Sequence, residues 1–257
     1  MNLRLDARQR AMLASMGVRV FEPLGREMPP LPPAPAASST ERSMARSAAP
    51  PTVPSAPAPE STGTGVCADI GSLDWDALVH AVATGRGCAT CSAARKQVFG
   101  TGDTRPEWLI VGDPPDEDEE EQGQPFMGEA GTLLDNMLRA AGLDRHHKVF
   151  LTNVLKCRLP GSRNPTAGEL AQCEPVLRRQ VELLQPQVIL VMGRFAVSTL
   201  LGTTEPIGKL RGRAHLYHGV PVVATYHPAY LLRNSTDKAR AWADLCLARE
   251  LLRGQPG

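Results

Sequence analysis

The sequence has no apolar run long enough to cross a membrane, and no apolar signal-peptide core follows residues 1–6. We therefore expect a cytoplasmic protein that has no membrane partner. Net charge is also nearly absent, since 28 Lys and Arg face 27 Asp and Glu, so overall charge indicates no particular partner. No glycine-rich loop of the phosphate-binding form is present, which argues against a nucleotide-binding protein.

The distribution of charge along the chain is more informative than its sum. From residue 151 onward there are 14 Lys and Arg against 7 Asp and Glu, and much of the balancing acid lies in the run from Asp116 to Glu121. Such a positive excess favours binding to a polyanion, because condensed counterions are released when the two meet. An ordinary solvated surface is the alternative explanation.

Composition divides the chain into three parts. Residues 29–69 are rich in Pro, Ala, Ser and Thr and predict a flexible linker, because they cannot bury enough apolar surface to fold. Residues 1–28 form a short tethered peptide, in which residues 7–17 could be helical. This peptide either docks on a protein partner or has no function. Residues 70–257 are expected to form the functional domain.

The domain alternates strand-like and helical patterns. Four continuous apolar runs predict strands buried on both faces: 108–111, 149–152, 188–191 and 220–224. Helical patterns lie at 132–141, 167–184, 195–201 and 237–252. The alternation predicts an α/β fold, with three α/β/α layers around a central, mainly parallel four-stranded sheet.

Polar residues follow each predicted strand. These are Asp113 after the first, Asn153 after the second, Gly193-Arg194 after the third and His227 after the fourth. In open α/β sheets, ligands bind beyond the carboxyl ends of the strands. An acid, an amide, a base and a histidine are therefore expected to converge at one edge of the sheet.

Four cysteines have a spacing that suggests metal binding. Cys88 and Cys91 form a C-x-x-C pair, and Cys157 and Cys173 lie far downstream. In a reducing compartment, cysteines are more often ligands or thiols than disulphides. The wide second spacing is unlike that of a zinc ribbon, so an iron–sulphur cluster of the 4Fe-4S type is favoured, although zinc remains open on spacing alone.

Motifs from Cys88 to the end of the chain resemble those of the family 4 uracil-DNA glycosylases. They cover roughly 170 residues in the right order and include motifs that are independent of the cysteines. They are Cys88-x-x-Cys91 with Val98-Phe-Gly100, Gly112-Asp-Pro-Pro, Gln122-Gly-Gln-Pro-Phe126-Met-Gly128, Thr152-Asn-Val-Leu-Lys-Cys-Arg158, Pro160-Gly-Ser-Arg-Asn-Pro-Thr166, Gly193-Arg-Phe-Ala196, Gly208-Lys-Leu-Arg-Gly212 and His227-Pro-Ala-Tyr-Leu-Leu232.

The resemblance implies a hydrolase that flips uracil out of single- or double-stranded DNA, cleaves its N-glycosidic bond and so starts base-excision repair. It implies a structural 4Fe-4S cluster on Cys88, Cys91, Cys157 and Cys173. The default expectation is a monomer in the cytoplasm, associated with the nucleoid.

Four residues receive roles in the site through this resemblance. Phe126 is the expected stacking surface for uracil. The amide of Asn153 is expected to accept from uracil N3–H and donate to O4, a pattern that rejects cytosine. His227 is expected to donate to the developing O2 anion. Asp113 is expected to orient the attacking water or to stabilise the sugar cation.

The basic residues expected to contact phosphate are Arg158, Arg163, Lys209, Arg211 and Arg213. Leu231, within the stretch Tyr230-Leu-Leu-Arg233, is expected to wedge into the duplex with Arg233 nearby.

One motif departs from the family pattern. The usual Gly-Glu-Ala-Pro-Gly reads here Gly112-Asp-Pro-Pro-Asp116. The shorter arm of Asp113 is expected to displace a positioned water, and Asp116 is expected to crowd the pocket or repel phosphate. The departure motivates an alternative, an iron–sulphur DNA-binding or damage-sensing protein that turns over weakly or not at all.

Overall fold

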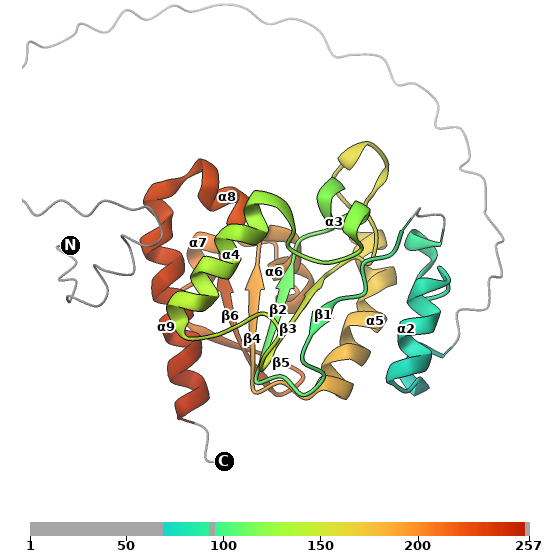
Figure 1. The fold of residues 1–257 in the computed structure, drawn as a ribbon, viewed down its shortest axis with the longest axis horizontal. Coiled ribbons are helices and arrows are strands. Elements are labelled where there is room, and N and C mark those ends of the chain that lie inside the picture. Colours follow the sequence, from blue (N-terminus) through green and yellow to red (C-terminus); the bar gives the residue numbers. More distant parts are fainter. Residues whose placement is uncertain (1–68, 93–95, 255–257) are drawn as a thin grey trace, which may run out of the picture. The chain divides into compact units, whose positions relative to one another are not determined.

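A six-stranded mixed sheet lies at the centre of the computed structural model, which describes residues 69–92 and 96–254 (Figure 1). The strand order is β1-β3-β2-β4-β6-β5, in which the inner four strands are parallel and both edge strands run antiparallel. The strands are β1 (Thr101–Gly102), β2 (Trp108–Gly112), β3 (Val149–Asn153), β4 (Val188–Met192), β5 (Ala214–Tyr217) and β6 (Val220–Thr225).

The predicted α/β class and all four predicted strands are confirmed, and they form the parallel centre of the sheet. The prediction of a four-stranded sheet was wrong in number, because two edge strands join it. β1 is only two residues long, and two of the four side chains of β5 are exposed, including Leu216 at 71%. Neither strand has the continuous apolar run that reveals a buried parallel strand.

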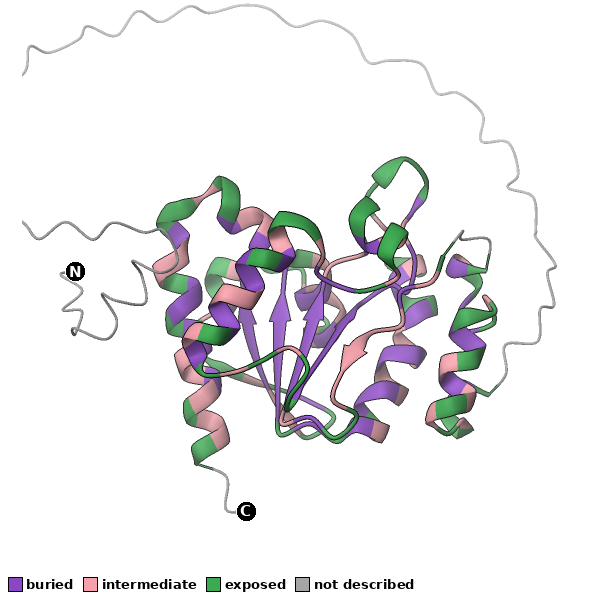
Figure 2. Ribbon diagram, in the orientation of Figure 1, coloured by how far each residue is buried: buried purple, intermediate pink, exposed green. Residues whose placement is uncertain are grey.

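Helices cover both faces of the sheet (Figure 1). They are α2 (Trp75–Ala83), α3 (Glu117–Gln122), α4 (Gly128–Ala141), α5 (Ala167–Leu184), α6 (Arg194–Leu201), α7 (Ile207–Leu210), α8 (Pro228–Arg233) and α9 (Lys238–Arg253). Successive side chains of a strand point to opposite faces. Leu109 therefore packs in the cluster that contains residues of α5 and α6, whereas Ile110 packs in the cluster with residues of α4 and α9. Figure 2 shows the buried strands between these helical layers.

Local sequence explains where the longer helices begin. α5 starts as predicted because Thr166 and Glu169 form a capping box, in which each side chain bonds the backbone N–H of the other residue. α4 begins four residues before its predicted start, with Gly128 at φ 63°. Its C-terminus is set by Gly142 in the left-handed region.

The topology marks one position for a ligand. The chain leaves β2 to form β3 on one side and later returns to form β4 on the other side. Such a reversal opens a crevice at the carboxyl ends of the two diverging strands. Asp113 follows β2 and Gly193 follows β4, so both lie at this crevice.

Predictions for residues 1–28 and for nearly all of the 29–69 linker lie outside the described residues. The described residues all belong to one compact unit. Among the helices that the structure describes, none combines the length and apolar character that crossing a membrane requires.

Candidate active site

A cavity of 590 Å³ opens at the carboxyl ends of β2, β4 and β6. Asp113, Gly193 and His227, which follow those strands, line it. Phe126 and Asn153 are not lining residues, but each contacts one that is: Phe126 stacks on His227, and Asn153 bonds the backbone of Asp113. The structure thus brings the four predicted site residues into one connected group.

Asp113 is held by the N-terminus of α6. Its Oδ1 accepts hydrogen bonds from the backbone N–H groups of Phe195 at 2.8 Å and Ala196 at 3.0 Å. Burial raises the pKa of Asp113 to about 6, and these N–H bonds act in the opposite direction. Gly193 makes the contact possible, because a Cβ there would lie 2.3 Å from the Asp113 carboxyl carbon. The carboxylate is therefore fixed in place and ionised at neutral pH.

Asp116 does not crowd the cavity, contrary to the expectation from sequence. It is exposed, lies outside the cavity lining and caps α3, accepting from the Glu119 N–H at 3.0 Å. An aspartate serves this capping position well, because its short side chain reaches the free N–H groups of the first turn.

Glu119 is a site residue that the sequence did not reveal. It is buried, and burial raises its pKa to about 7. One carboxylate oxygen accepts from the Phe126 N–H and, at 3.3 Å, from the Asn153 amide, while the other accepts from the Asp116 N–H at 2.8 Å. An acidic run is usually a solvated face, and only the three-residue spacing from Asp116 signalled a capping box.

The Asn153 side chain is fully buried with a defined orientation. Its Nδ2 donates to the backbone oxygen of Asp113 at 2.8 Å and to Glu119 at 3.3 Å. Both partners are acceptors, so they determine which end of the amide carries the nitrogen. Its Oδ1 is buried without a hydrogen-bond partner in the described part of the chain. This oxygen is thus an acceptor still to be satisfied, whereas both amide hydrogens have partners within the protein. The predicted donation from this amide to O4 would require one of these bonds to be exchanged.

Phe126 and His227 form a stacked pair with ring centroids 5.5 Å apart and planes 19° from parallel. Phe126 has φ 54°, and its backbone oxygen accepts from Arg145 at 3.1 Å. Its ring lies against Gly112, where a Cβ would approach within 2.6 Å of the ring. The glycine that ends β2 is therefore needed for this aromatic packing.

The tautomer of His227 follows from one contact. Its Nδ1 accepts from the Ala229 N–H at 3.3 Å, so the proton of the neutral ring lies on Nε2. Burial, with a smaller contribution from Arg233, lowers the pKa of His227 to about 4. At neutral pH the ring is an uncharged donor through Nε2.

The four cysteines predicted as ligands meet in one buried group. Cys88 and Cys91 lie at the short 3-10 turn of residues 89–91, Cys157 follows β3, and Cys173 lies on α5. Sulphur atoms of Cys88, Cys91 and Cys173 lie within 4.8 Å of one another. In the structure Cys88 is paired with Cys173, and Cys91 with Cys157, as disulphides. The sulphur atoms of Cys91 and Cys173 are 3.6 Å apart. No histidine or carboxylate of the described residues joins this group.

Lys156, immediately before Cys157, is also buried. Its Nζ donates to Thr152 Oγ1 at 2.6 Å, to the Asn153 backbone oxygen at 2.8 Å and to Gln180 Oε1 at 2.7 Å. Burial lowers its pKa to about 7. Its burial was not predictable from the sequence, because a lysine is usually exposed.

Two of the predicted DNA contacts do not fit the structure. Arg211 forms a bidentate ion pair with the buried Asp244, at 2.9 and 3.0 Å, so the main partner of its guanidinium is a carboxylate inside the protein. Leu231 is fully buried in the core beside α4, whereas Leu232 next to it is 42% exposed. Within the stretch predicted to wedge into the duplex, Leu231 is therefore a core residue and Leu232 is the leucine that reaches the surface.

The other predicted basic residues are compatible with a DNA-binding surface. Arg158 and Arg163 bond nearby glutamates at the surface, and Lys209 and Arg213 are exposed. Arg233 is exposed and lines the cavity together with Arg194, which sequence reasoning did not include among the phosphate contacts.

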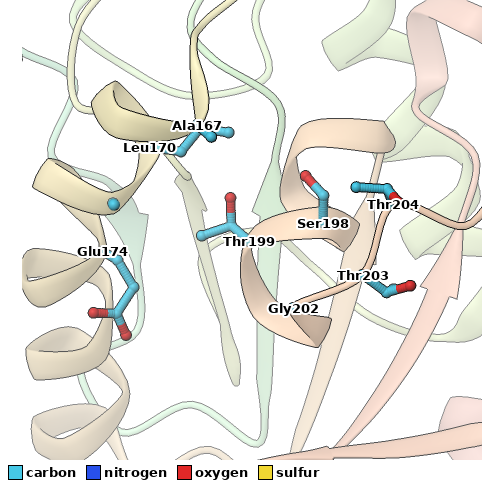
Figure 3. A pocket seen from close by; sticks show the side chains of 9 residues that line it. Ala167, Leu170, Glu174, Ser198, Thr199, Gly202, Thr203 and Thr204 are labelled. Carbon is cyan, nitrogen blue, oxygen red and sulfur yellow. The ribbon is translucent and has the colours of Figure 1, made fainter.

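A second cavity, of 380 Å³, lies between α5 and α6 (Figure 3). Figure 3 shows Glu174 of α5 on one side of it and Ser198 and Thr199 of α6 on the other. Both hydroxyls donate to the Phe195 backbone oxygen, and the Glu174 carboxylate accepts from the Tyr217 hydroxyl. No predicted site residue lines this cavity.

Comparison with known proteins supplies independent information. A sequence model described as Uracil DNA glycosylase superfamily matches residues 99–246. The chain is 37% identical to the type-4 uracil-DNA glycosylase of Archaeoglobus fulgidus, over 61% of this chain and 82% of that protein. It is 40% identical to that of Thermotoga maritima, over 56% and 75%, and 34% identical to that of Saccharolobus solfataricus, over 66% and 84%. The chain therefore belongs to the uracil-DNA glycosylase superfamily and, within it, to the type-4 family.

Proposed function

We propose that this enzyme is a hydrolase that flips uracil out of DNA and cleaves its N-glycosidic bond, the first step of base-excision repair. The observation that carries the proposal is the buried, unpartnered Oδ1 of Asn153. A buried acceptor without a partner is costly, so a ligand that supplies a donor is favoured. The N3–H of uracil is such a donor. Cytosine has a lone pair at N3, which would face Oδ1 as a second acceptor.

The roles of the other site residues follow from their protonation states. His227 donates from Nε2 to uracil O2 as negative charge develops there, and such a donor typically lowers the barrier by about 3–4 kcal/mol. Asp113, ionised and fixed against α6, orients the attacking water or stabilises the positive charge on the sugar. Phe126 is the aromatic surface on which the flipped base stacks.

We assign Cys88, Cys91, Cys157 and Cys173 as the ligands of a 4Fe-4S cluster. Four buried cysteines with no oxygen or nitrogen ligand among the described residues fit such a cluster. When bound, the cluster would link three chain segments, which is a structural role. Cys157 and Asn153 lie on the same buried turn, so a cluster bound to Cys157 would help to hold the backbone near Asn153 in place.

DNA binding is assigned to basic residues that are exposed or half-buried, with Leu232 in place of Leu231 as the apolar wedge. These basic residues are Arg158, Arg163, Lys209, Arg213 and Arg233. We assign catalysis to residues 70–257 of a monomer acting at the nucleoid, with residues 1–28 open to a protein partner.

The test is an oligonucleotide assay. Cluster-loaded protein is incubated with a labelled oligonucleotide that contains one uracil, and alkali then cuts the strand wherever a base has been lost. Cleavage at uracil and none at cytosine is expected. Binding to uracil-containing DNA without cleavage, on both single and double strands, would instead identify a non-catalytic DNA-binding protein.

A further inference from the structure

Lys156 is a buried cation whose bonded partners are all neutral. Its three acceptors are a hydroxyl, a backbone carbonyl and a side-chain amide oxygen, at 2.6–2.8 Å. The hydroxyl hydrogen of Thr152 is directed to the Phe99 backbone oxygen at 2.9 Å, so Thr152 accepts from the lysine. Three acceptors require three N–H groups, which an ammonium has and a neutral amine lacks.

A buried charge is stable only when opposite charge lies near it. No carboxylate of the described residues is bonded to Lys156, but the cysteine group lies next to it. Cys157 is the next residue, and Cys88 and Cys91 line the same small internal space as Lys156. On α5, Gln180 lies seven residues after Cys173 and so on the same helix face, about 10 Å further along. A cluster held by four thiolates would carry a net negative charge, because the thiolates outweigh the positive charge of its core, and it would supply the missing opposite charge.

The same ammonium holds the base-reading residue. It donates to the backbone oxygen of Asn153, at the point where β3 ends and the buried turn toward Cys157 begins. The Asn153 amide is held from the other side by Asp113 and Glu119. Lys156 is therefore in contact with the backbone of Asn153 and adjacent to the cysteine group.

We propose that Lys156 is a positioning residue that couples the cysteine site to Asn153: the bound cluster stabilises its charge, and its N–H groups fix the backbone of Asn153. The link between Lys156 and Asn153 matters only if the proposed function holds. The link between the cluster and the charge of Lys156 depends only on a thiolate-bound cluster.

Two substitutions separate the charge from the hydrogen bond. Lys156→Met keeps the length of the side chain and removes both. Lys156→Gln removes the charge and keeps a donor for the Asn153 carbonyl. Lys148→Met is the matched control, because Lys148 is exposed, lies beside β3 and pairs with Glu107. Each cluster-loaded protein is mixed with an excess of iron chelator, and iron release is followed by absorbance. Single-turnover cleavage of the uracil oligonucleotide and its dissociation constant are measured separately.

Lys156→Met is expected to release iron at least fivefold faster than wild type and to cleave at least tenfold more slowly, with DNA affinity within twofold. Lys156→Gln is expected to release iron equally fast and to cleave within threefold of wild type. Lys148→Met should match wild type throughout. Iron release at the wild-type rate from Lys156→Gln, or wild-type protein that binds no iron, overturns the inference.

If Lys156→Met does not fold, iron release from Lys156→Gln alone tests whether the charge of Lys156 is coupled to the cluster. If wild-type protein does not cleave uracil-containing DNA, the proposed function fails, and iron release still tests the coupling of Lys156 to the cysteine site.

Discussion

The amide nitrogen of Asn153 lies 2.8 Å from the backbone oxygen of Asp113, and the amide oxygen is buried without a hydrogen-bond partner among the described residues. We predict that Asn153→Ala lowers single-turnover cleavage of uracil-containing DNA at least tenfold, because the acceptor for N3–H is lost. Asn136→Ala is the control, since Asn136 lies on α4, outside the site, where its side chain accepts a hydrogen bond from Arg139. A rate for Asn153→Ala within threefold of wild type would contradict the assignment.

Cleavage should depend on pH through Asp113. Burial raises the pKa of Asp113 to about 6, so the reactive carboxylate is half protonated at pH 6 and is lost progressively below it. We expect the single-turnover rate to be constant above pH 7 and to fall about tenfold per pH unit below 6. Rates measured from pH 4.5 to 8.5 test this.

Asp113→Asn should be slow at every pH and should lack this acidic limb. Burial also raises the pKa of Glu119, to about 7, so Glu119→Gln is the necessary comparison. A limb that disappears in Glu119→Gln and persists in Asp113→Asn would assign the titration to Glu119.

Gly193→Ala should disrupt the site indirectly, by displacing the carboxylate of Asp113. The new methyl group would lie 2.3 Å from the Asp113 carboxyl carbon, at a residue with φ 106°. We expect cleavage to fall at least tenfold and the free energy of unfolding to fall by about 1–3 kcal/mol.

Gly202→Ala is the matched control for backbone strain. Gly202 also has positive φ, 60°, but a Cβ there meets nothing within 4 Å. It should lose about 1 kcal/mol of stability and keep normal cleavage. Equal loss of cleavage in both variants would show that strain alone, and not the contact with Asp113, affects the site.

Leu231 and Leu232 should respond in opposite ways. Leu231→Ala removes a fully buried side chain and is expected to lower the free energy of unfolding by about 2–5 kcal/mol. Leu232→Ala removes an exposed side chain, so thermal unfolding should not change. It should slow cleavage of double-stranded DNA more than that of single-stranded DNA, because a wedge acts only on a stack.

Metal content tests the cysteine assignment. Wild-type protein purified without oxygen should be brown and contain iron and inorganic sulphide. Cys173→Ala should lose both and unfold at lower temperature, because three segments are no longer linked. Cys246→Ala, outside the four-cysteine group, should keep them. A colourless protein that contains zinc, or one without metal whose four cysteines are oxidised, would contradict a 4Fe-4S cluster.

The fold was predictable where one physical signal dominates. Continuous apolar runs located all four inner strands, and the boundaries of α5 were predicted correctly because Thr166 and Glu169 cap it. The convergence of Asp113, Asn153 and His227 followed from their places after parallel strands. The edge strands were missed because β5 exposes half of its side chains and β1 is too short to have a pattern.

Details that depend on a tertiary partner were not predictable. Arg211 was predicted as a phosphate contact because its ion-pair partner, Asp244, lies 33 residues away in the sequence. Glu119 lay hidden in an acidic run, since burial depends on the loop that carries Phe126. The choice between Leu231 and Leu232 depended on the register of a helix of only six residues.

The close contact between Asp113 and Gly193 should constrain how these two positions evolve. Two segments 80 residues apart share one space, and neither can enlarge unless the other yields. Among homologues, positions 113 and 193 should therefore covary, with a bulkier residue at 193 tolerated only where the acid at 113 has been replaced or its loop has moved. An aligned family would show this as a missing combination.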